Sequence, residues 1–160
     1  MDKTINAISK ILSSRGKTIC TIESCTGGSL ASLLTSVSGA SSYFMGGLIP
    51  YSDQTKNQVL KIKKDTLKKY GAVSAETSQE MLINGLRLFK TDYGISTTGF
   101  AGPTGGTEQY PIGTIVVSYG SLTDIHTHIL SLSGSREENI SQTQKQVLGL
   151  FLKYLQKFKN

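Results

Sequence analysis

Tryptophan is absent from this sequence, and cysteine and histidine occur only twice each. Cys20 and Cys25 form neither a disulfide framework nor a metal-binding spacing, which is typical of proteins that remain in a reducing cytoplasm. The sequence also lacks any run of about 18 apolar residues, the length needed to cross a membrane. No apolar signal-peptide core follows residues 1–4. We therefore expect a cytoplasmic protein without a membrane span.

Internal repeats, low-complexity segments and linkers are missing as well. A chain of 160 residues suits one domain and is long enough to bury roughly 68–70% of its unfolded surface. Its content of 38% hydrophobic and 18% charged residues is ordinary for a globular protein. We predict a single domain over residues 1–160.

The charge balance is positive, with 17 Lys and Arg against 11 Asp and Glu and a net charge of +6. Much of the excess lies in residues 61–69 and in Lys153, Lys157 and Lys159. Nucleic-acid binding is one interpretation of such a pattern. No aromatic side chain is interleaved in residues 61–69, however, so we favour solvent-exposed helix faces over a nucleic-acid site.

The most informative stretch is ESCTGG at residues 23–28. A β-branched run at 17–22 precedes it and leucines with helical spacing follow it, so the pattern predicts a strand, a tight turn and a helix. The paired glycines and the helix start expose backbone N–H groups that favour an anion or a developing oxyanion. Ser24, Cys25 and Thr26 would then offer a nucleophile or a group that grips a polar ligand. The alternative is a turn whose Ser and Thr only cap the helix.

The remaining chain alternates between helical and strand patterns. We predict helices over 3–15, from the turn to about 37, from Ser52 or Asp53, over 65–70, from Ser74 to 89 and from about Ser135, and strands at 44–51, 93–98, 113–119 and 125–132. Such alternation indicates an α/β layered domain. The neighbouring strands at 113–119 and 125–132 predict an antiparallel hairpin and therefore a mixed sheet.

A second glycine-rich loop covers residues 99–107 and contains four glycines. No Gly-Lys-Ser/Thr follows, so it is not a phosphate-binding loop of the nucleotidase type. It can form a backbone nest for an anion or a carbonyl, or it can be a plain tight connection. Its composition does not separate these two interpretations.

Three further side chains have both a functional and a structural interpretation. Lys56 lies at a strand-to-helix junction, where a buried lysine could deprotonate a serine, although most lysines are exposed. Arg136 begins a helix after Ser-Gly-Ser and could bind a phosphate with two hydrogen bonds, although an isolated arginine is usually on the surface. His126 and His128 share one face of a strand, and without a third ligand nearby we favour a solvated face over a metal site.

Taken together, the motifs resemble those of the CinA C-terminal domain family in identity and order, over about residues 5 to 155. The matching stretches are ESCTGG at 23–28, GASS at 39–42, YSDQTK at 51–56, GAVS at 71–74, TGFAGP at 98–103 and PIGT at 111–114. The resemblance implies a three-layer α/β/α domain with a mixed, mostly parallel sheet. It also implies the standalone form of the family, without the additional N-terminal domain of the longer members.

The activity implied by this resemblance is that of a nicotinamide-nucleotide amidase. Such an enzyme converts nicotinamide mononucleotide, a small-molecule nucleotide, to nicotinate mononucleotide and ammonia without a metal or organic cofactor. Ser24 would be the nucleophile, Lys56 its base, and Tyr51 a helper in proton transfer. The expected substrate-side residues are Thr26, Gly27, Gly28, Ser42, Thr98, Gly99, Gly102, Gly105 and Arg136. We also expect a homo-oligomer.

The mechanism expected from these residues starts with neutral Lys56 removing the Ser24 proton as the hydroxyl attacks the carboxamide. Backbone N–H groups of the glycine turn would stabilise the oxyanion, and Arg136 or residues 102–107 would hold the phosphate. The pKa of Lys56 must then be strongly lowered. Two alternatives remain: a non-catalytic nucleotide- or partner-binding module with the same fold, and a thiol nucleophile at Cys25.

Overall fold

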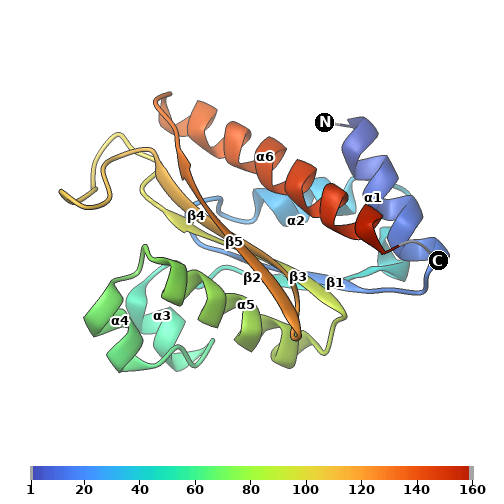
Figure 1. Cartoon of the computed structure of the whole chain (residues 1–160), viewed down its shortest axis with the longest axis horizontal. Helices are drawn as coiled ribbons and strands as arrows, with labels where there is room; N and C mark the ends of the chain where they lie inside the picture. The colour runs from blue at the N-terminus through green and yellow to red at the C-terminus, as the bar shows by residue number, and fades with distance from the viewer. Residues whose placement is uncertain (1, 159–160) are drawn as a thin grey trace.

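The computed structural model describes residues 2–158, which form a five-stranded sheet between two layers of helices (Figure 1). The elements in chain order are α1 (Asp2–Ser14), β1 (Ile19–Glu23), α2 (Ser29–Thr35), the 3-10 helix η1 (Ala40–Ser42), β2 (Phe44–Leu48), α3 (Asp53–Gln58), α4 (Lys64–Tyr70), α5 (Ala75–Phe89), β3 (Tyr93–Gly99), β4 (Thr114–Ser121), β5 (Asp124–Ser131) and α6 (Arg136–Lys157). No helix within the described range is long and apolar enough to span a bilayer.

The strands are ordered β2-β1-β3-β4-β5 across the sheet. β1 pairs in parallel with both β2 and β3, whereas β4 runs antiparallel to β3 and to β5. Four strands therefore point in one direction and β4 points in the other. Of the four pairs of neighbouring strands, two are parallel and two are antiparallel. The predicted mixed sheet and the predicted hairpin are both confirmed.

The two faces of the sheet carry separate apolar cores, which confirms the three-layer architecture. On the face covered by α1, α2 and α6, Ile8, Leu34 and Phe151 belong to the larger core (Figure 1). On the face covered by α3, α4 and α5, Ile22 packs with Met81 in the smaller core. Every residue of β1 is buried, as expected for a strand that has parallel neighbours on both sides and helices on both faces.

Serines cap the three helices that were predicted to start at Ser52 or Asp53, at Ser74 and at about Ser135. The hydroxyl oxygens of Ser52 and Ser74 accept hydrogen bonds from backbone N–H groups in the first turns of α3 and α5. Ser135 forms a capping box with Glu138 at the start of α6. These caps are local interactions between residues three apart, which is why the sequence shows them directly.

Some element boundaries differ from the prediction. β1 begins at Ile19 rather than at residue 17, because the preceding two residues bind Asp92. β2 ends at Leu48 rather than near residue 51, just before Pro50, which has no N–H to donate to a ladder. α2 ends at Thr35, about two residues earlier than predicted.

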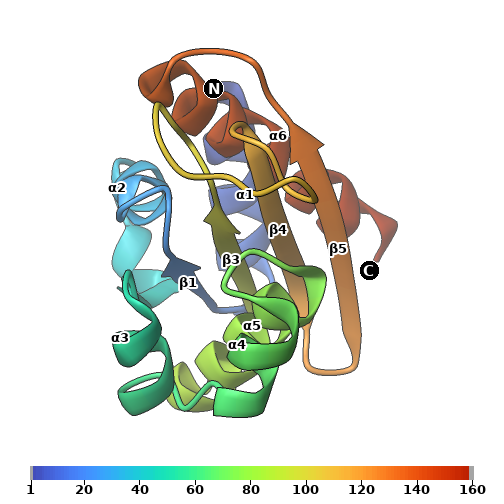
Figure 2. The ribbon, with the colours of Figure 1, turned by 90° about the vertical axis from the view of Figure 1, so that its left-hand side faces the viewer.

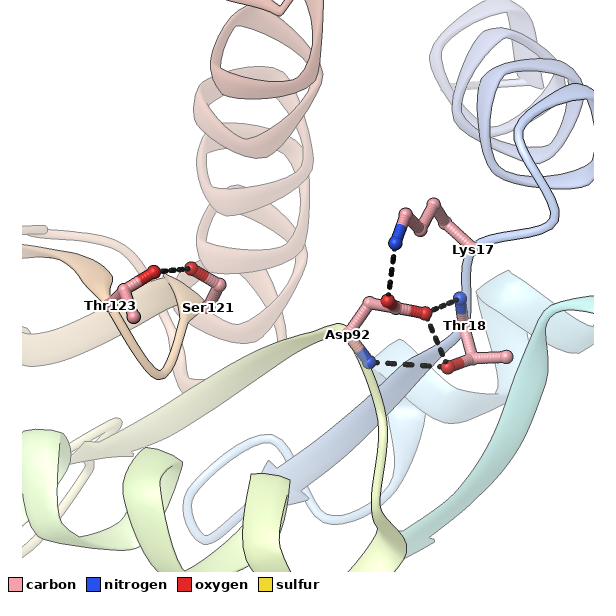
Figure 3. A network of polar contacts seen from close by, with 5 residues as sticks. All are labelled: Lys17, Thr18, Asp92, Ser121 and Thr123. Atoms are coloured by element: carbon pink, nitrogen blue, oxygen red, sulfur yellow. Dashed lines mark hydrogen bonds and ion pairs between the residues drawn. The ribbon is translucent and has the colours of Figure 1, made fainter.

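Asp92 joins the starts of β1 and β3 (Figure 3). Its carboxylate accepts hydrogen bonds from Lys17 Nζ at 2.7 Å, Thr18 N at 2.9 Å and Thr18 Oγ1 at 3.0 Å. The resulting register pairs Ile19 with Tyr93 and, at the other end of the strands, Glu23 with Thr97. This register brings the turn after β1 next to the last residues of β3.

Candidate active site

The carboxyl ends of the parallel strands β1, β2 and β3 lie at the same end of the sheet, which is the usual place for a ligand in an open α/β fold. Figure 2 shows β1 and β3 among them. The turn after β1, the start of α3, the loop after β3 and the start of α6 surround a cavity of about 180 Å³ there. The residues lining this cavity are Ser24, Cys25, Tyr51, Asp53, Lys56, Ala72, Val73, Thr98, Gly99, Phe100 and Arg136.

Lys56 and Ser24 form the chemical centre of the cavity. Lys56 Nζ lies 3.2 Å from Ser24 Oγ, 3.0 Å from the carbonyl oxygen of Pro50 and 3.1 Å from that of Tyr51. The lysine is 1% exposed and the serine 8%. A neutral amine has two N–H donors and one lone pair, so the two carbonyls can take both hydrogens and leave the lone pair directed at the serine hydroxyl.

The electrostatic environment favours this neutral form. Burial lowers the pKa of Lys56 below its ordinary value, and the carboxylate of Asp53 offsets part of this effect. Within residues 2–158, no carboxylate forms an ion pair with the lysine. Burial thus shifts the pKa of Lys56 in the predicted direction, toward the neutral amine that a proton acceptor requires.

The local sequence explains why Lys56 faces inward. Ser52 caps α3, and its carbonyl accepts the backbone N–H of Lys56 at 2.9 Å. Pro50 and Tyr51 connect β2 to this cap, so their carbonyls lie beside the first turn of the helix. Leu60 and Ile62 anchor the far end of α3 in the smaller core.

In the turn after β1, the two glycines have the predicted conformations, but their N–H groups bind acceptors within the protein. Gly27 and Gly28 adopt left-handed φ angles of 61° and 93°. The N–H of Gly28 donates to Glu23 Oε2 at 3.0 Å, and the N–H of Gly27 donates to the carbonyl of Ser24 at 3.1 Å. The expectation that these two glycine N–H groups bind an oxyanion is therefore wrong, because internal acceptors already occupy them.

The backbone N–H of Cys25 is the remaining candidate for an oxyanion donor in this turn. In a strand–nucleophile–helix turn, the residue after the nucleophile supplies this donor. The Thr26 hydroxyl points into the turn, where it donates to Glu23 Oε2 at 2.8 Å and lies 2.7 Å from Thr97 Oγ1. Thr26 was predicted on the substrate side, but its side chain braces the turn instead.

The Cys25 thiol is a poor alternative nucleophile. It is 5% exposed and packs in the larger core. Burial raises its pKa to about 12, so very little thiolate exists at neutral pH. Ser24, which contacts the buried lysine, is the better placed of the two.

Arg136 and Tyr51 close one side of the cavity together. Arg136 donates from Nη2 to the Tyr51 hydroxyl and from Nη1 to the carbonyl of Gly102, both at 2.9 Å. The structure thus brings Arg136 to the site, as predicted. The Tyr51 hydroxyl is held by the guanidinium, and only its carbonyl contacts Lys56. Tyr51 therefore lies at the site, but its hydroxyl does not form the hydrogen bond to Lys56 that a proton relay through this hydroxyl would require.

Other predicted substrate-side residues divide into two groups. Thr98 and Gly99 line the cavity, and the Thr98 hydroxyl donates to the carbonyl of Ala72 at 2.7 Å. Gly105 does not line it; this glycine lies in the loop after β3, where Phe100 is its nearest side chain.

The prediction for Ser42 needs correction. Its hydroxyl lies 3.1 Å from that of Ser13 and donates to the carbonyl of Gly39. Ser42 precedes β2, whose first residue Phe44 pairs with Ile19 at the start of β1. Ser42 therefore lies at the amino-terminal end of the parallel strands, whereas Ser24 lies at their carboxyl end, because η1 precedes β2 in the chain.

His126 and His128 lie on β5, away from the cavity. Their rings stack on Tyr119 at centroid distances of 5.6 and 5.7 Å. His126 also pairs with Asp124, and His128 Nε2 lies 3.1 Å from the Tyr119 hydroxyl. Among residues 2–158 there is no group of three or more His, Cys, Asp or Glu side chains that could hold a metal ion.

Two polar residues that support the site had no predicted role. Glu23 caps the turn after β1, and its position at the end of an apolar strand before a helix start was the available signal. Asn139 is fully buried in α6 and donates to the carbonyls of Ala101 and Gly134. It shares a helical stripe with Thr143 and Val147, so a polar residue on a buried face was the signal there.

Comparison with known proteins agrees with the fold. The family model of the CinA C-terminal domain matches residues 1–155. A CinA-like protein of Cytophaga hutchinsonii is 43% identical over 152 residues, which are 95% of this chain and 36% of that protein. A putative competence-damage inducible protein of a Thermoanaerobacter species is 42% identical over 146 residues, 91% of this chain and 35% of the relative.

Solved structures match over nearly the whole chain. The crystal structure of competence damage-inducible protein A from Klebsiella pneumoniae has a TM-score of 0.94 at 29% identity and 98% coverage of both chains. A competence/damage inducible protein from Agrobacterium tumefaciens has a TM-score of 0.91 at 27% identity, covering 94% of this chain and 93% of its own.

The chain spans about a third of the length of the curated relatives it matches, whereas it covers these two solved chains almost completely. The family model, the identities above 40% and the shared fold agree with one another. The chain belongs to the CinA C-terminal domain family.

Proposed function

We propose that this chain is a serine–lysine amidohydrolase that converts nicotinamide mononucleotide to nicotinate mononucleotide and ammonia. The contact between Lys56 Nζ and Ser24 Oγ carries the proposal. A buried lysine with a lowered pKa, hydrogen-bonded to two carbonyls and one serine, is arranged as a base for that serine.

The reaction proceeds in two halves. Neutral Lys56 takes the hydroxyl proton as Ser24 Oγ forms a bond to the carboxamide carbon, and the resulting ammonium then protonates the leaving nitrogen. The carbon–nitrogen bond breaks, ammonia departs, and an ester joins the acyl group to Ser24. Water, deprotonated by Lys56, attacks this ester and releases the carboxylic acid, while the serine recovers its proton.

Charge develops on the carbonyl oxygen in both tetrahedral intermediates. The backbone N–H of Cys25 is the donor best placed for this oxygen, because it follows the nucleophile in the turn. A single donor of this kind contributes on the order of 10²–10³ in rate. The loop after β3 completes the wall of the cavity around this position through Gly99 and Phe100.

The nucleotide substrate is supported by the family resemblance and by the chemistry of the cavity rim. The cavity volume of about 180 Å³ is below the roughly 300–1,000 Å³ of pockets that enclose a whole ligand. It therefore suits the carboxamide-bearing ring, with ribose and phosphate extending over the rim. The Arg136 guanidinium lies there with no carboxylate partner within residues 2–158, and it would bind the phosphate.

The decisive experiment measures ammonia and nicotinate mononucleotide formed from nicotinamide mononucleotide by the purified protein. We expect release by the wild type and a loss of roughly 10³-fold or more in Ser24→Ala and in Lys56→Met. Lys63→Met, which removes an exposed lysine at the start of α4, is the matched control and should retain activity.

Each other outcome has a clear meaning. Release that survives in Ser24→Ala would keep the reaction and reject the nucleophile. A folded wild type that binds the nucleotide without releasing ammonia would instead be the non-catalytic nucleotide-binding module with the same fold.

A further inference from the structure

Glu23 is a buried carboxylate directly before the nucleophile, and it is 1% exposed. Its Oε2 accepts hydrogen bonds from Thr26 Oγ1 at 2.8 Å and from the backbone N–H groups of Gly28 and Leu30 at 3.0 Å. Its Oε1 accepts the N–H of Ala31 at 2.8 Å. Burying a carboxylate is costly unless its oxygens are satisfied, and here four donors satisfy it. Within residues 2–158 it forms no ion pair with a cation.

The first consequence is electrostatic. The N–H groups at the start of α2, which the sequence predicted would be open to a ligand anion, are taken by a negative charge of the chain itself. A second anion at this place would meet a like charge and no free donor. The backbone N–H of Cys25, the residue directly after Ser24, is then the candidate donor for an oxyanion formed at Ser24.

The second consequence is mechanical. Thr97 on β3 accepts the backbone N–H of Ser24 at 2.9 Å, and its hydroxyl lies 2.7 Å from that of Thr26. Glu23 holds Thr26 from the other side. The short segment from Ser24 to Thr26 is thus held at both ends and cannot rotate without breaking hydrogen bonds buried in the core.

We propose that Glu23 is a positioning residue for the nucleophile. Its carboxylate joins the start of α2 to the turn, so that Ser24 Oγ faces Lys56 and the Cys25 N–H faces the developing oxyanion. This inference rests on the proposed serine–lysine reaction. Because Glu23 is buried beneath the turn, its loss lowers kcat, through worse alignment, and leaves the KM for the nucleotide unchanged.

The primary test is Glu23→Gln, which keeps the shape but replaces one acceptor oxygen with an NH₂ facing N–H donors. We expect kcat to fall by roughly 10- to 100-fold with KM within about twofold, since a small misalignment of reacting atoms costs rate rather than binding. Glu80→Gln is the matched control, because Glu80 Oε1 also accepts a backbone N–H, that of Lys63 before α4, and neither residue lines the Ser24 cavity. An unchanged kcat, or a raised KM with normal kcat, overturns the proposal.

A folding defect in Glu23→Gln would not end the test. Thr26→Val removes only the hydroxyl between Glu23 and Thr97, and we expect a smaller fall in kcat with retained fold by circular dichroism. If both variants fold, their effects on log kcat should be non-additive, because they break one hydrogen-bond network. A folded Thr26→Val variant with wild-type kcat and wild-type labelling by the probe below overturns the proposal.

A fluorophosphonate probe separates this inference from the choice of substrate. Ser24 Oγ attacks phosphorus, fluoride leaves and the proton passes to Lys56, so labelling measured by mass spectrometry reports the aligned nucleophile without an amide. If the wild type is labelled but releases no ammonia, and labelling is slower in Glu23→Gln, the positioning role stands and the amidase assignment is rejected. A wild type that is neither labelled nor active overturns both proposals.

Discussion

Lys56 contacts Ser24 with Nζ 3.2 Å from Oγ, while the carbonyls of Pro50 and Tyr51 hold the same nitrogen from two other directions. The three acceptors come from two different strand-to-helix connections, after β1 and after β2. This arrangement gives a buried lysine one orientation and makes its protonation state the main variable of the site.

Protonation of Lys56 links the stability of the protein to pH. Burial places the folded pKa below the ordinary 10.5, so between these two values the unfolded chain binds one more proton than the folded chain. The free energy of unfolding of the wild type, relative to Lys56→Met, should therefore rise with pH in this window, by up to about 1.4 kcal/mol per pH unit. Below the folded pKa of Lys56, the difference in free energy of unfolding between the two proteins should not change with pH. Urea unfolding of both proteins from pH 6 to 10 checks this, and a constant difference would contradict a lowered pKa.

Asp53 tunes the same group in the opposite direction. Its carboxylate raises the pKa of Lys56, so Asp53→Asn should lower that pKa further and leave more neutral amine at pH 7. The acid limb of the kcat/KM profile for ammonia release should then move to lower pH. Asp65→Asn, in the first turn of α4, is the matched control. A shift to higher pH would show that Asp53 acts on another step.

Cys25 should be dispensable as a nucleophile. Burial raises the pKa of its thiol to about 12, which leaves too little thiolate at neutral pH. Cys25→Ser should keep ammonia release within a few-fold of the wild type, with some loss of stability from the core. Loss of activity in a folded Cys25→Ser variant, together with retention in Ser24→Ala, would make the thiol the nucleophile.

Arg136 should act on binding through the phosphate. Arg136→Ala removes a charge-assisted hydrogen-bond donor worth about 1.5–3 kcal/mol, so KM for nicotinamide mononucleotide should rise by roughly 10- to 100-fold. KM for nicotinamide riboside, which lacks the phosphate, should change little. Tyr51→Phe removes only the hydroxyl that accepts from Arg136 and should have a weaker effect. Equal effects on both substrates would assign the guanidinium a structural role.

Thr21 offers a prediction about stability alone. Its hydroxyl oxygen is fully buried in β1 and has no hydrogen-bond partner within residues 2–158. Thr21→Val replaces that hydroxyl with a methyl group of similar size and should raise the free energy of unfolding by about 1 kcal/mol. Thr97→Val, on the neighbouring strand, removes a bonded hydroxyl and should lower it. Urea midpoints measure both, and a lower midpoint for Thr21→Val would indicate an unseen partner for the hydroxyl.

The local parts of the site could be predicted from sequence. The serine caps at Ser52, Ser74 and Ser135 depend on residues three positions away, and all three are present. The glycine turn after β1 and the strand–helix alternation depend on short-range patterns of the same kind. The ordered motifs identified the family, and with it the expected pairing of Ser24 and Lys56, before any contact was known.

Two of the errors, at Ser42 and Tyr51, come from the long-range arrangement of the chain. Ser42 belongs to a family motif, but η1 leads into the start of β2, at the far edge of the sheet. The Tyr51 hydroxyl was assigned to a proton relay, but Arg136, 85 positions away in the chain, holds it. In neither case does the nearby sequence report which partner the side chain meets.

By itself, the sequence determined the element order, the helix caps and the residue types available at the edge of the sheet, because these depend on the backbone and side chains of neighbouring residues. Only the tertiary structure decided that Lys56 is buried against Ser24 and that Glu23 takes the N–H groups of α2. The first depends on strand register and on packing across the sheet, which bring residues 32 positions apart into contact and desolvate the lysine. The second depends on how the turn after β1 folds back on Glu23, which the residue types alone do not report.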